Sequence, residues 1–122
     1  MQRGKRIIRS FRAAFHGFWH VLRYESSFKY MCVVAVLVLG GMLYFGTSRQ
    51  ENVALLTMIF AVLALELMNT AFERFLDFLN PEHDERIRII KDVLAAIVLV
   101  VSCGAAVIGA VIFFPHIQVL VM

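Results

Sequence analysis

The sequence ALELMNTAFERFLD, from Ala64 to Asp77, continues an apolar run that begins at Val53 and then interrupts it with polar side chains. On a helix, at about 100° per residue, four of these share an arc of about 80°: Glu66, Asn69, Glu73 and Asp77. An acidic residue at the centre of a membrane helix costs roughly 2.5–3.5 kcal/mol. This stripe therefore predicts a functional site in a membrane helix, the alternative being that Arg74 and Asp77 have already reached the water.

The composition of the 122 residues favours a membrane protein over a soluble domain. Hydrophobic residues make up 61% and charged residues 17%, whereas soluble domains contain about 45–50% and about 25%. Residues 30–48 and 52–65 carry no charge, and His116 alone interrupts the apolar run from Val93 to the end. A membrane helix needs about 20 residues, so the second run qualifies only if Glu66 lies inside the membrane. We predict a single all-α integral membrane domain over residues 1–122.

The order of elements follows from hydrophobic spacing and charge. Residues 1–29 carry seven of the twelve basic residues, and aromatic and aliphatic residues recur there every three or four positions. This pattern predicts an amphipathic surface helix over residues 3–23 that lies in the membrane interface. We expect membrane helices over residues 30–46, 53–79 and 91–114. Asn80-Pro81 and Pro115 are expected to end the second and third of them.

The distribution of Lys and Arg predicts the orientation in the membrane. Seven basic residues precede the first span, one lies in the turn 46–52, and three lie in the loop 80–92. We therefore expect the N-terminus and the loop 80–92 to be cytoplasmic and the C-terminus to lie outside. The apolar face of the surface helix and the spans that follow explain the basic charge, so nucleic acid is not expected as a partner.

This topology places seven polar residues at the cytoplasmic ends of the helices: Glu25, Glu66, Asn69, Glu73, Asp77, Lys91 and Asp92. Such a set suits a site that holds Mg²⁺ and a polyphosphate while one carboxylate accepts a proton from an alcohol. The sequence has no P-loop and no kinase Gly-rich loop, so the nucleotide site would be of another kind. The other class of function is a non-catalytic oligomer or cation pathway lined by Glu66 and Glu73. Lys91 favours the phosphate site, since a cation path needs no lysine at its mouth.

The pattern E-x-x-N-[ST]-A-x-E-x-x-x-D, followed about 14 residues later by the Lys-Asp of IIKDVLAA, resembles the prokaryotic diacylglycerol kinase family of small membrane lipid kinases. The resemblance covers nearly the whole chain, including the basic amphipathic start and R-x-E-x-x-F before the first span. The GTSRQE turn and the FFP near the C-terminus are more similar to its Gram-positive branch, whose members resemble undecaprenol kinases.

The resemblance implies a homotrimeric helix bundle in a bacterial cell membrane. Each active site would be shared between neighbouring protomers near the cytoplasmic interface. The enzyme would transfer the γ-phosphate of Mg-ATP to the hydroxyl of a membrane lipid alcohol. Undecaprenol is the expected acceptor, and diacylglycerol is the alternative.

The match of the motif also implies roles for individual residues. Glu66 would be the general base, and Glu25 and Glu73 would be Mg²⁺ ligands. Asn69 and Asp92 would order the catalytic site and its nucleotide. Lys91 and the basic residue Arg6 would contact phosphate.

The loop PEHDER, residues 81–86, departs from the P-E-Y-H that is usual in the family. The family's loop contacts nucleotide, which places Glu82 among the nucleotide-binding residues. His83 and Asp84 either contribute to the adenine side of the site or are merely solvated. We interpret three further histidines as interfacial polar residues, since none has a partner at ligand spacing in the sequence: His16, His20 and His116.

Overall fold

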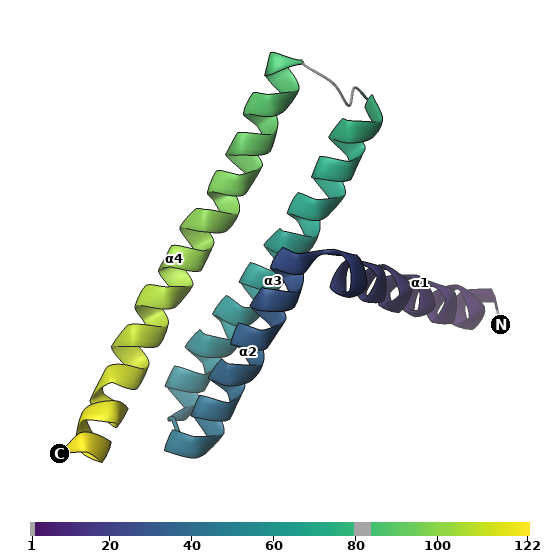
Figure 1. Cartoon of the computed structure of the whole chain (residues 1–122). Coiled ribbons are helices and arrows are strands. Elements are labelled where there is room, and N and C mark those ends of the chain that lie inside the picture. The colour runs from purple at the N-terminus through teal and green to yellow at the C-terminus, as the bar shows by residue number, and fades with distance from the viewer. Residues whose placement is uncertain (1, 80–83) are drawn as a thin grey trace.

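A computed structural model describes residues 2–79 and 84–122, which form four helices (Figure 1). The helices are α1 (Gln2–Tyr24), α2 (Ser26–Phe45), α3 (Arg49–Leu79) and α4 (Glu85–Val121). The last three run antiparallel to their neighbours in a bundle, and α1 leaves the bundle sideways. Each of those three is long and apolar enough to cross a membrane. The all-α prediction with three candidate spans and a separate N-terminal helix is confirmed.

The lengths of the helices set the depth of the site. At about 1.5 Å per residue, the 20 residues of α2 span about 30 Å, which matches the hydrocarbon thickness of a bilayer. Helix α3 has 31 residues and starts beside the end of α2, so it continues beyond the α1–α2 corner. Met68 is the twentieth residue of α3 and lies about level with Ser26 by this count. The residues after Met68 thus belong to the part of α3 that projects past α1.

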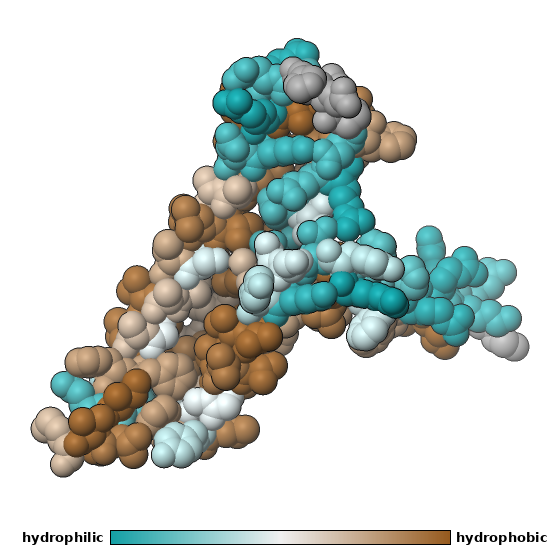
Figure 2. All heavy atoms as spheres, viewed as in Figure 1, coloured by the Kyte–Doolittle hydropathy of each residue, from teal (hydrophilic) through white to brown (hydrophobic). Residues whose placement is uncertain are grey.

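Helix α1 is attached to the bundle near its C-terminal end. The ring of Phe18 packs edge-on against the ring of Phe28 of α2 at 5.2 Å, and Phe28 is fully buried. The rest of α1 exposes large apolar side chains such as Phe11 and Phe15. Figure 2 shows hydrophilic side chains along the upper side of α1 and hydrophobic ones beneath it. This is the arrangement of a helix lying in a membrane interface.

Two local signals form the turn between α2 and α3. Gly46 ends α2 in the left-handed conformation, with φ of 62°, and its N–H donates to the Met42 carbonyl at 3.0 Å. Ser48 and Glu51 then form a capping box at the start of α3. The Ser48 N–H donates to Glu51 Oε1 at 2.9 Å, and the Glu51 N–H donates to Ser48 Oγ at 3.2 Å.

The predicted end of the last helix at Pro115 is wrong, because α4 continues through this proline to Val121. A proline inside a helix removes one backbone hydrogen bond and strains the preceding turn. The turn after Pro115 is held in place by other helices, since His116 Nε2 lies 3.3 Å from Glu51 Oε1 and the His116 ring lies against the ring of Phe45. The helices also begin four to six residues before the predicted spans, because a helix need not start where the bilayer does.

Several small residues of α4 face a cavity between the helices. Ser102, Ala105 and Gly109 line an apolar cavity of about 360 Å³ between α2, α3 and α4. A close approach occurs elsewhere, at Gly41 of α2, where an added Cβ would lie 3.1 Å from Cε1 of Phe113. A side chain at position 41 would therefore press against the Phe113 ring, which would have to shift by a few tenths of an ångström.

Candidate active site

The polar stripe of α3 begins with a buried carboxylate. Glu66 is 5% exposed, and Thr70, one turn later, is 4% exposed. Asn69 donates from Nδ2 to Oε1 of Glu73 at 3.5 Å. The Asn69 Oδ1 atom is buried and has no hydrogen-bond partner among the described residues. Because buried polar atoms are normally paired, this oxygen is a free acceptor at the centre of the stripe.

Glu25 comes to this site from the corner between α1 and α2. It occupies the N-cap position of α2, but its side chain makes no capping hydrogen bond. Its Oε1 instead accepts a hydrogen bond from Nη2 of Arg74 at 2.8 Å. Glu73 lies two turns after Glu66 on the same face of α3 and immediately precedes Arg74. The structure therefore brings three of the predicted site residues, Glu25, Glu66 and Glu73, to the part of α3 near the α1–α2 corner.

The donor set fits Mg²⁺ that arrives with a nucleotide. Within residues 2–79 and 84–122, no three His, Cys, Asp or Glu side chains form a complete metal site. Mg²⁺ does not need one, because in nucleotide sites it is usually held by one or two carboxylates plus phosphate and water oxygens. Glu25 and Glu73 can supply such carboxylates, and the free Asn69 Oδ1 can accept a hydrogen bond from a coordinated water.

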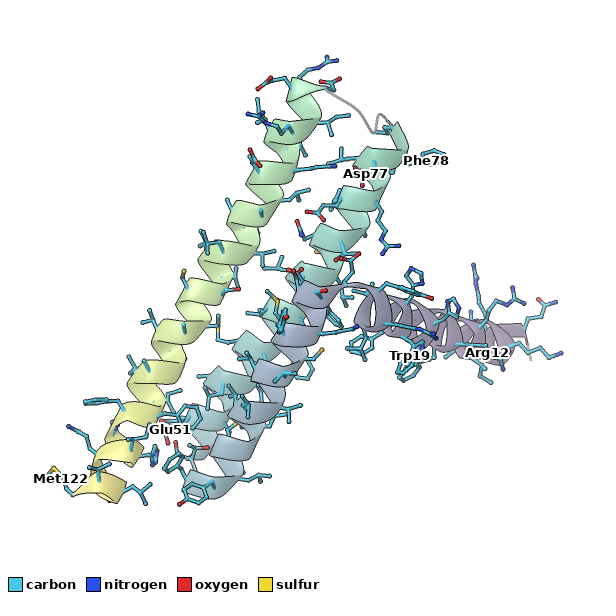
Figure 3. All side chains as sticks on the ribbon, in the orientation of Figure 1. Arg12, Trp19, Glu51, Asp77, Phe78 and Met122 are labelled. Carbon is cyan, nitrogen blue, oxygen red and sulfur yellow. The ribbon has the colours of Figure 1, made fainter. Side chains whose placement is uncertain are left out.

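The start of α4 supplies a second group of charges. They lie where α3 and α4 project beyond the α1–α2 corner. Lys91 forms an ion pair with Asp77, which lies near the end of α3 (Figure 3). Asp92 is exposed, and it forms no ion pair with any residue of the two described ranges. The structure thus brings Lys91 to the acidic stripe through Asp77, whereas Asp92 is not brought to it within one protomer.

The loop between α3 and α4 is described only from Asp84 onward, so the predictions for Glu82 and His83 lie outside the described residues. Asp84 is the N-cap of α4, and its Oδ1 accepts a hydrogen bond from the Arg86 N–H at 2.9 Å. Its carboxylate also pairs with the Arg86 side chain, and these hydrogen bonds lower the pKa of Asp84. Asp84 therefore has a structural capping role and is not merely solvated.

Arg6 lies far from the other candidate residues of its own protomer. It precedes His20 by 14 residues, which is about 21 Å along α1. Figure 3 shows Arg12 already well away from the bundle, and Arg6 lies closer to the free end of α1. A contact between Arg6 and a phosphate bound near Glu66 would therefore require the α1 of a neighbouring protomer.

Two contacts that reach across the chain were not predicted. Nη1 of Arg74 lies 3.0 Å from Nε2 of His20, which makes Arg74 a link between α3 and α1. At the opposite end of the bundle, His116 pairs with Glu51. Neither histidine has a partner at ligand spacing in the sequence, and the long-range pairs with Arg74 and Glu51 are additional to that prediction. No local signal could have found these pairs, because their members lie 54 and 65 residues apart in the sequence.

The sequence matches a known protein family and resembles individual relatives. The model of the family described as prokaryotic diacylglycerol kinase matches residues 12–113. An undecaprenol kinase of Bacillus subtilis is 31% identical over 110 residues, which cover 90% of this chain and 89% of that protein. A diacylglycerol kinase of Haemophilus influenzae is 26% identical over 109 residues, covering 88% and 92% of the two chains.

Proposed function

We propose a specific reaction for this chain, which belongs to the prokaryotic diacylglycerol kinase family and is an ATP-dependent lipid kinase of the membrane. In our proposal it transfers the γ-phosphate of Mg-ATP to undecaprenol and so makes undecaprenyl phosphate. The observation that carries the proposal is the buried Glu66 carboxylate, which shares a face of α3 with Glu73 and lies near the level where Glu25 and α1 meet the bundle.

Glu66 acts as the general base in this proposal. Its carboxylate accepts the proton of the lipid hydroxyl while the hydroxyl oxygen attacks the γ-phosphorus and ADP leaves. The position of Glu66 suits this task, since it lies within about one turn of the level of Ser26 at the start of α2. A lipid alcohol can therefore present its hydroxyl to Glu66 while its tail remains in hydrocarbon.

Glu25 and Glu73 would hold Mg²⁺, and the metal would offset the negative charge of the polyphosphate. Asn69 keeps Glu73 in place through its Nδ2 and offers Oδ1 to the bound reactants. Lys91 and Asp92 open α4 on the nucleotide side, where Lys91 contacts a phosphate and Asp92 orders the site. Glu82 belongs to the loop that we expect to face the nucleotide.

We propose undecaprenol because the site offers little for a larger headgroup. A polyprenol presents one primary hydroxyl, whereas diacylglycerol also brings two ester groups. Residues 60–65, which precede Glu66 in α3, carry no side-chain donor for the esters, and on the other side of the site the donors within 26–29 are Ser26, Ser27 and Lys29. An apolar pocket separates tails that differ by one methylene by only about 1–3 kcal/mol, so the headgroup decides the preference. Diacylglycerol remains the alternative acceptor.

The proposal includes an orientation and an oligomer. ATP is cytoplasmic, so the end of the bundle that bears α1, Glu66 and the α3–α4 loop faces the cytoplasm and the C-terminus lies outside. This agrees with the excess of Lys and Arg on that side. A homotrimer with shared sites is supported by the remoteness of Arg6, and by the few apolar side chains that the described helices bury within one protomer: Phe28, Leu55, Leu76 and Ile112.

Competition between the two lipids tests the acceptor. Purified protein is given ATP, Mg²⁺ and equal mole fractions of undecaprenol and diacylglycerol in one mixed micelle, and the phosphorylated products are separated by thin-layer chromatography. We expect both products, with undecaprenyl phosphate in excess. An excess of phosphatidic acid would assign the chain to diacylglycerol phosphorylation and leave its kinase activity standing.

A further inference from the structure

Arg74 uses both terminal nitrogens of its guanidinium group to join three segments of the chain. Nη2 donates to Oε1 of Glu25 at 2.8 Å, and Nη1 lies 3.0 Å from Nε2 of His20. Arg74 itself extends from α3 and immediately follows Glu73 in the sequence. The guanidinium group is therefore held at the α1–α2 corner by His20 of α1 and by Glu25, which lies between α1 and α2.

Glu25, one of the two contact partners of Arg74, is also one of the carboxylates proposed to bind Mg²⁺. The Arg74 side chain is 49% exposed and that of Glu25 is 34% exposed. Ion pairs at this level of exposure contribute little to stability, because water competes for both partners. The pair can therefore exchange partners easily when stronger ligands arrive, namely a divalent cation for the carboxylate and a polyphosphate for the guanidinium.

We propose that Arg74 is a phosphate-binding residue of the ATP site, held in place by Glu25 and His20 until Mg-ATP enters. This inference rests on the proposed function, since it takes Glu25 as a metal ligand. Once Glu25 is engaged by Mg²⁺, Nη2 of Arg74 is free to donate to a phosphate oxygen. A guanidinium group suits this task because its planar donors match phosphate geometry. The His20 contact keeps Nη1 in place during the exchange.

A purely structural explanation gives a different expectation. If Arg74 only ties α1 to α3, its loss would loosen the α1–α2 corner and weaken every property that depends on that corner. If Arg74 binds phosphate, its loss weakens nucleotide binding, whereas the Glu25 carboxylate becomes more available to a metal ion. Opposite changes in the two affinities are therefore the signature of the proposed role.

The experiment measures both affinities without turnover. Binding of the non-hydrolysable analogue AMP-PCP with Mg²⁺ is measured by calorimetry, and binding of Mn²⁺ without nucleotide is measured by electron paramagnetic resonance, both in detergent micelles. For Arg74→Gln we expect the AMP-PCP Kd to rise about tenfold, as for the loss of a charged hydrogen bond. The Mn²⁺ Kd is expected to fall. Arg74→Lys, which keeps the charge without the planar fork, should have an intermediate AMP-PCP Kd.

Two further variants separate phosphate binding from the structural tie. Arg49→Gln changes an exposed arginine at the opposite end of the same helix and should leave both affinities unchanged. His20→Ala removes one arm of the tie but leaves the charge of Arg74, so AMP-PCP should bind within about threefold of the wild type. An unchanged AMP-PCP Kd in Arg74→Gln would overturn the inference. So would an equal loss of both affinities in Arg74→Gln and His20→Ala together with a lower melting temperature.

The outcome is distinguishable from a failure of the proposed function. The acceptor preference is measured on the wild-type protein with lipid, whereas the Arg74 measurements need no lipid. If the wild type binds AMP-PCP but phosphorylates no undecaprenol, the substrate proposal fails and the Arg74 comparison remains decisive. If the wild type phosphorylates undecaprenol but the Arg74 variants bind AMP-PCP and Mn²⁺ as the wild type does, the kinase proposal stands and the proposed role of Arg74 is wrong.

Discussion

Lys91 of α4 forms an ion pair with Asp77 of α3, across the two helix ends that project beyond the α1–α2 corner. The lysine side chain is 33% exposed and the aspartate side chain 54% exposed. A lysine ammonium group is a compact charge on a flexible stem and can turn from one anion to another. Asp77 therefore holds Lys91 at the end of the polar stripe of α3.

The first prediction separates the two members of this pair. Lys91→Met should raise the KM for ATP roughly tenfold or more, because a charged hydrogen bond to phosphate contributes about 1.5–3 kcal/mol. Asp77→Asn removes the competing partner of Lys91 and should leave the KM for ATP unchanged or lower. Both are measured by ATP titration at saturating lipid. An equal rise in the two variants would show that the ion pair, and not Lys91 alone, is needed.

The second prediction concerns the proton acceptor. Glu66→Gln should lower kcat by about 10²–10⁴-fold, which is the usual contribution of a general base. The amide has the same size as the carboxyl group, so the buried position of Glu66 should be filled as before. Elution volume and melting temperature in detergent check this, and Glu66→Asp, which keeps a carboxylate, should retain more activity than the glutamine variant. Near-wild-type activity in Glu66→Gln would exclude its role as base.

Much of the fold could be predicted because its signals are local. The apolar runs gave the three membrane helices, and the spacing of Glu66, Asn69 and Glu73 put them on one face, where Asn69 does bond to Glu73. The end of α4 could not be predicted in this way. Pro115 is a local stop signal, but contacts of His116 with Glu51 and Phe45, which belong to other helices, hold the turn that follows it.

The candidate site was less predictable, because its partners come from distant parts of the chain. Sequence spacing brought Glu25 to the correct end of the bundle, but it could not show that Arg74, 49 residues away, would hold it. The same holds for Lys91 and Asp77, which lie on different helices. Pairings of this kind depend on how the helices dock, and helical periodicity carries no information about docking.

The third prediction tests the metal ligands. Glu25→Ala and Glu73→Ala should each raise the Mg²⁺ concentration needed for half-maximal rate at fixed ATP, as well as lower the maximal rate, because each removes an oxygen ligand. Asp77→Asn is the matched control, since Asp77 lies on the same stripe but pairs with Lys91; its Mg²⁺ dependence should equal that of the wild type. A lower rate with an unchanged Mg²⁺ dependence in the alanine variants would indicate structural damage instead.

The fourth prediction follows from the distance between Arg6 and the site of its own protomer. If Arg6 serves a neighbouring site in a trimer, Arg6→Gln and Glu66→Gln are both impaired alone but complement each other when mixed. A site is intact when its Glu66 comes from one variant and its Arg6 from the other. In a ring of three subunits assembled at random from equal amounts, about a quarter of the sites meet this condition.

The mixing experiment is done by unfolding the two purified variants together, refolding them into micelles and measuring lipid phosphorylation. We expect about a quarter of the wild-type rate after random assembly. The control mixes Glu66→Gln with Asn69→Ala, whose changed residues lie on the same face of one α3, so no subunit supplies an intact pair and no activity should return. If Arg6→Gln is active alone, Arg6 is not needed for phosphate. If it is inactive and the mixture stays inactive, Arg6 acts within its own protomer, and the shared site would have to be abandoned.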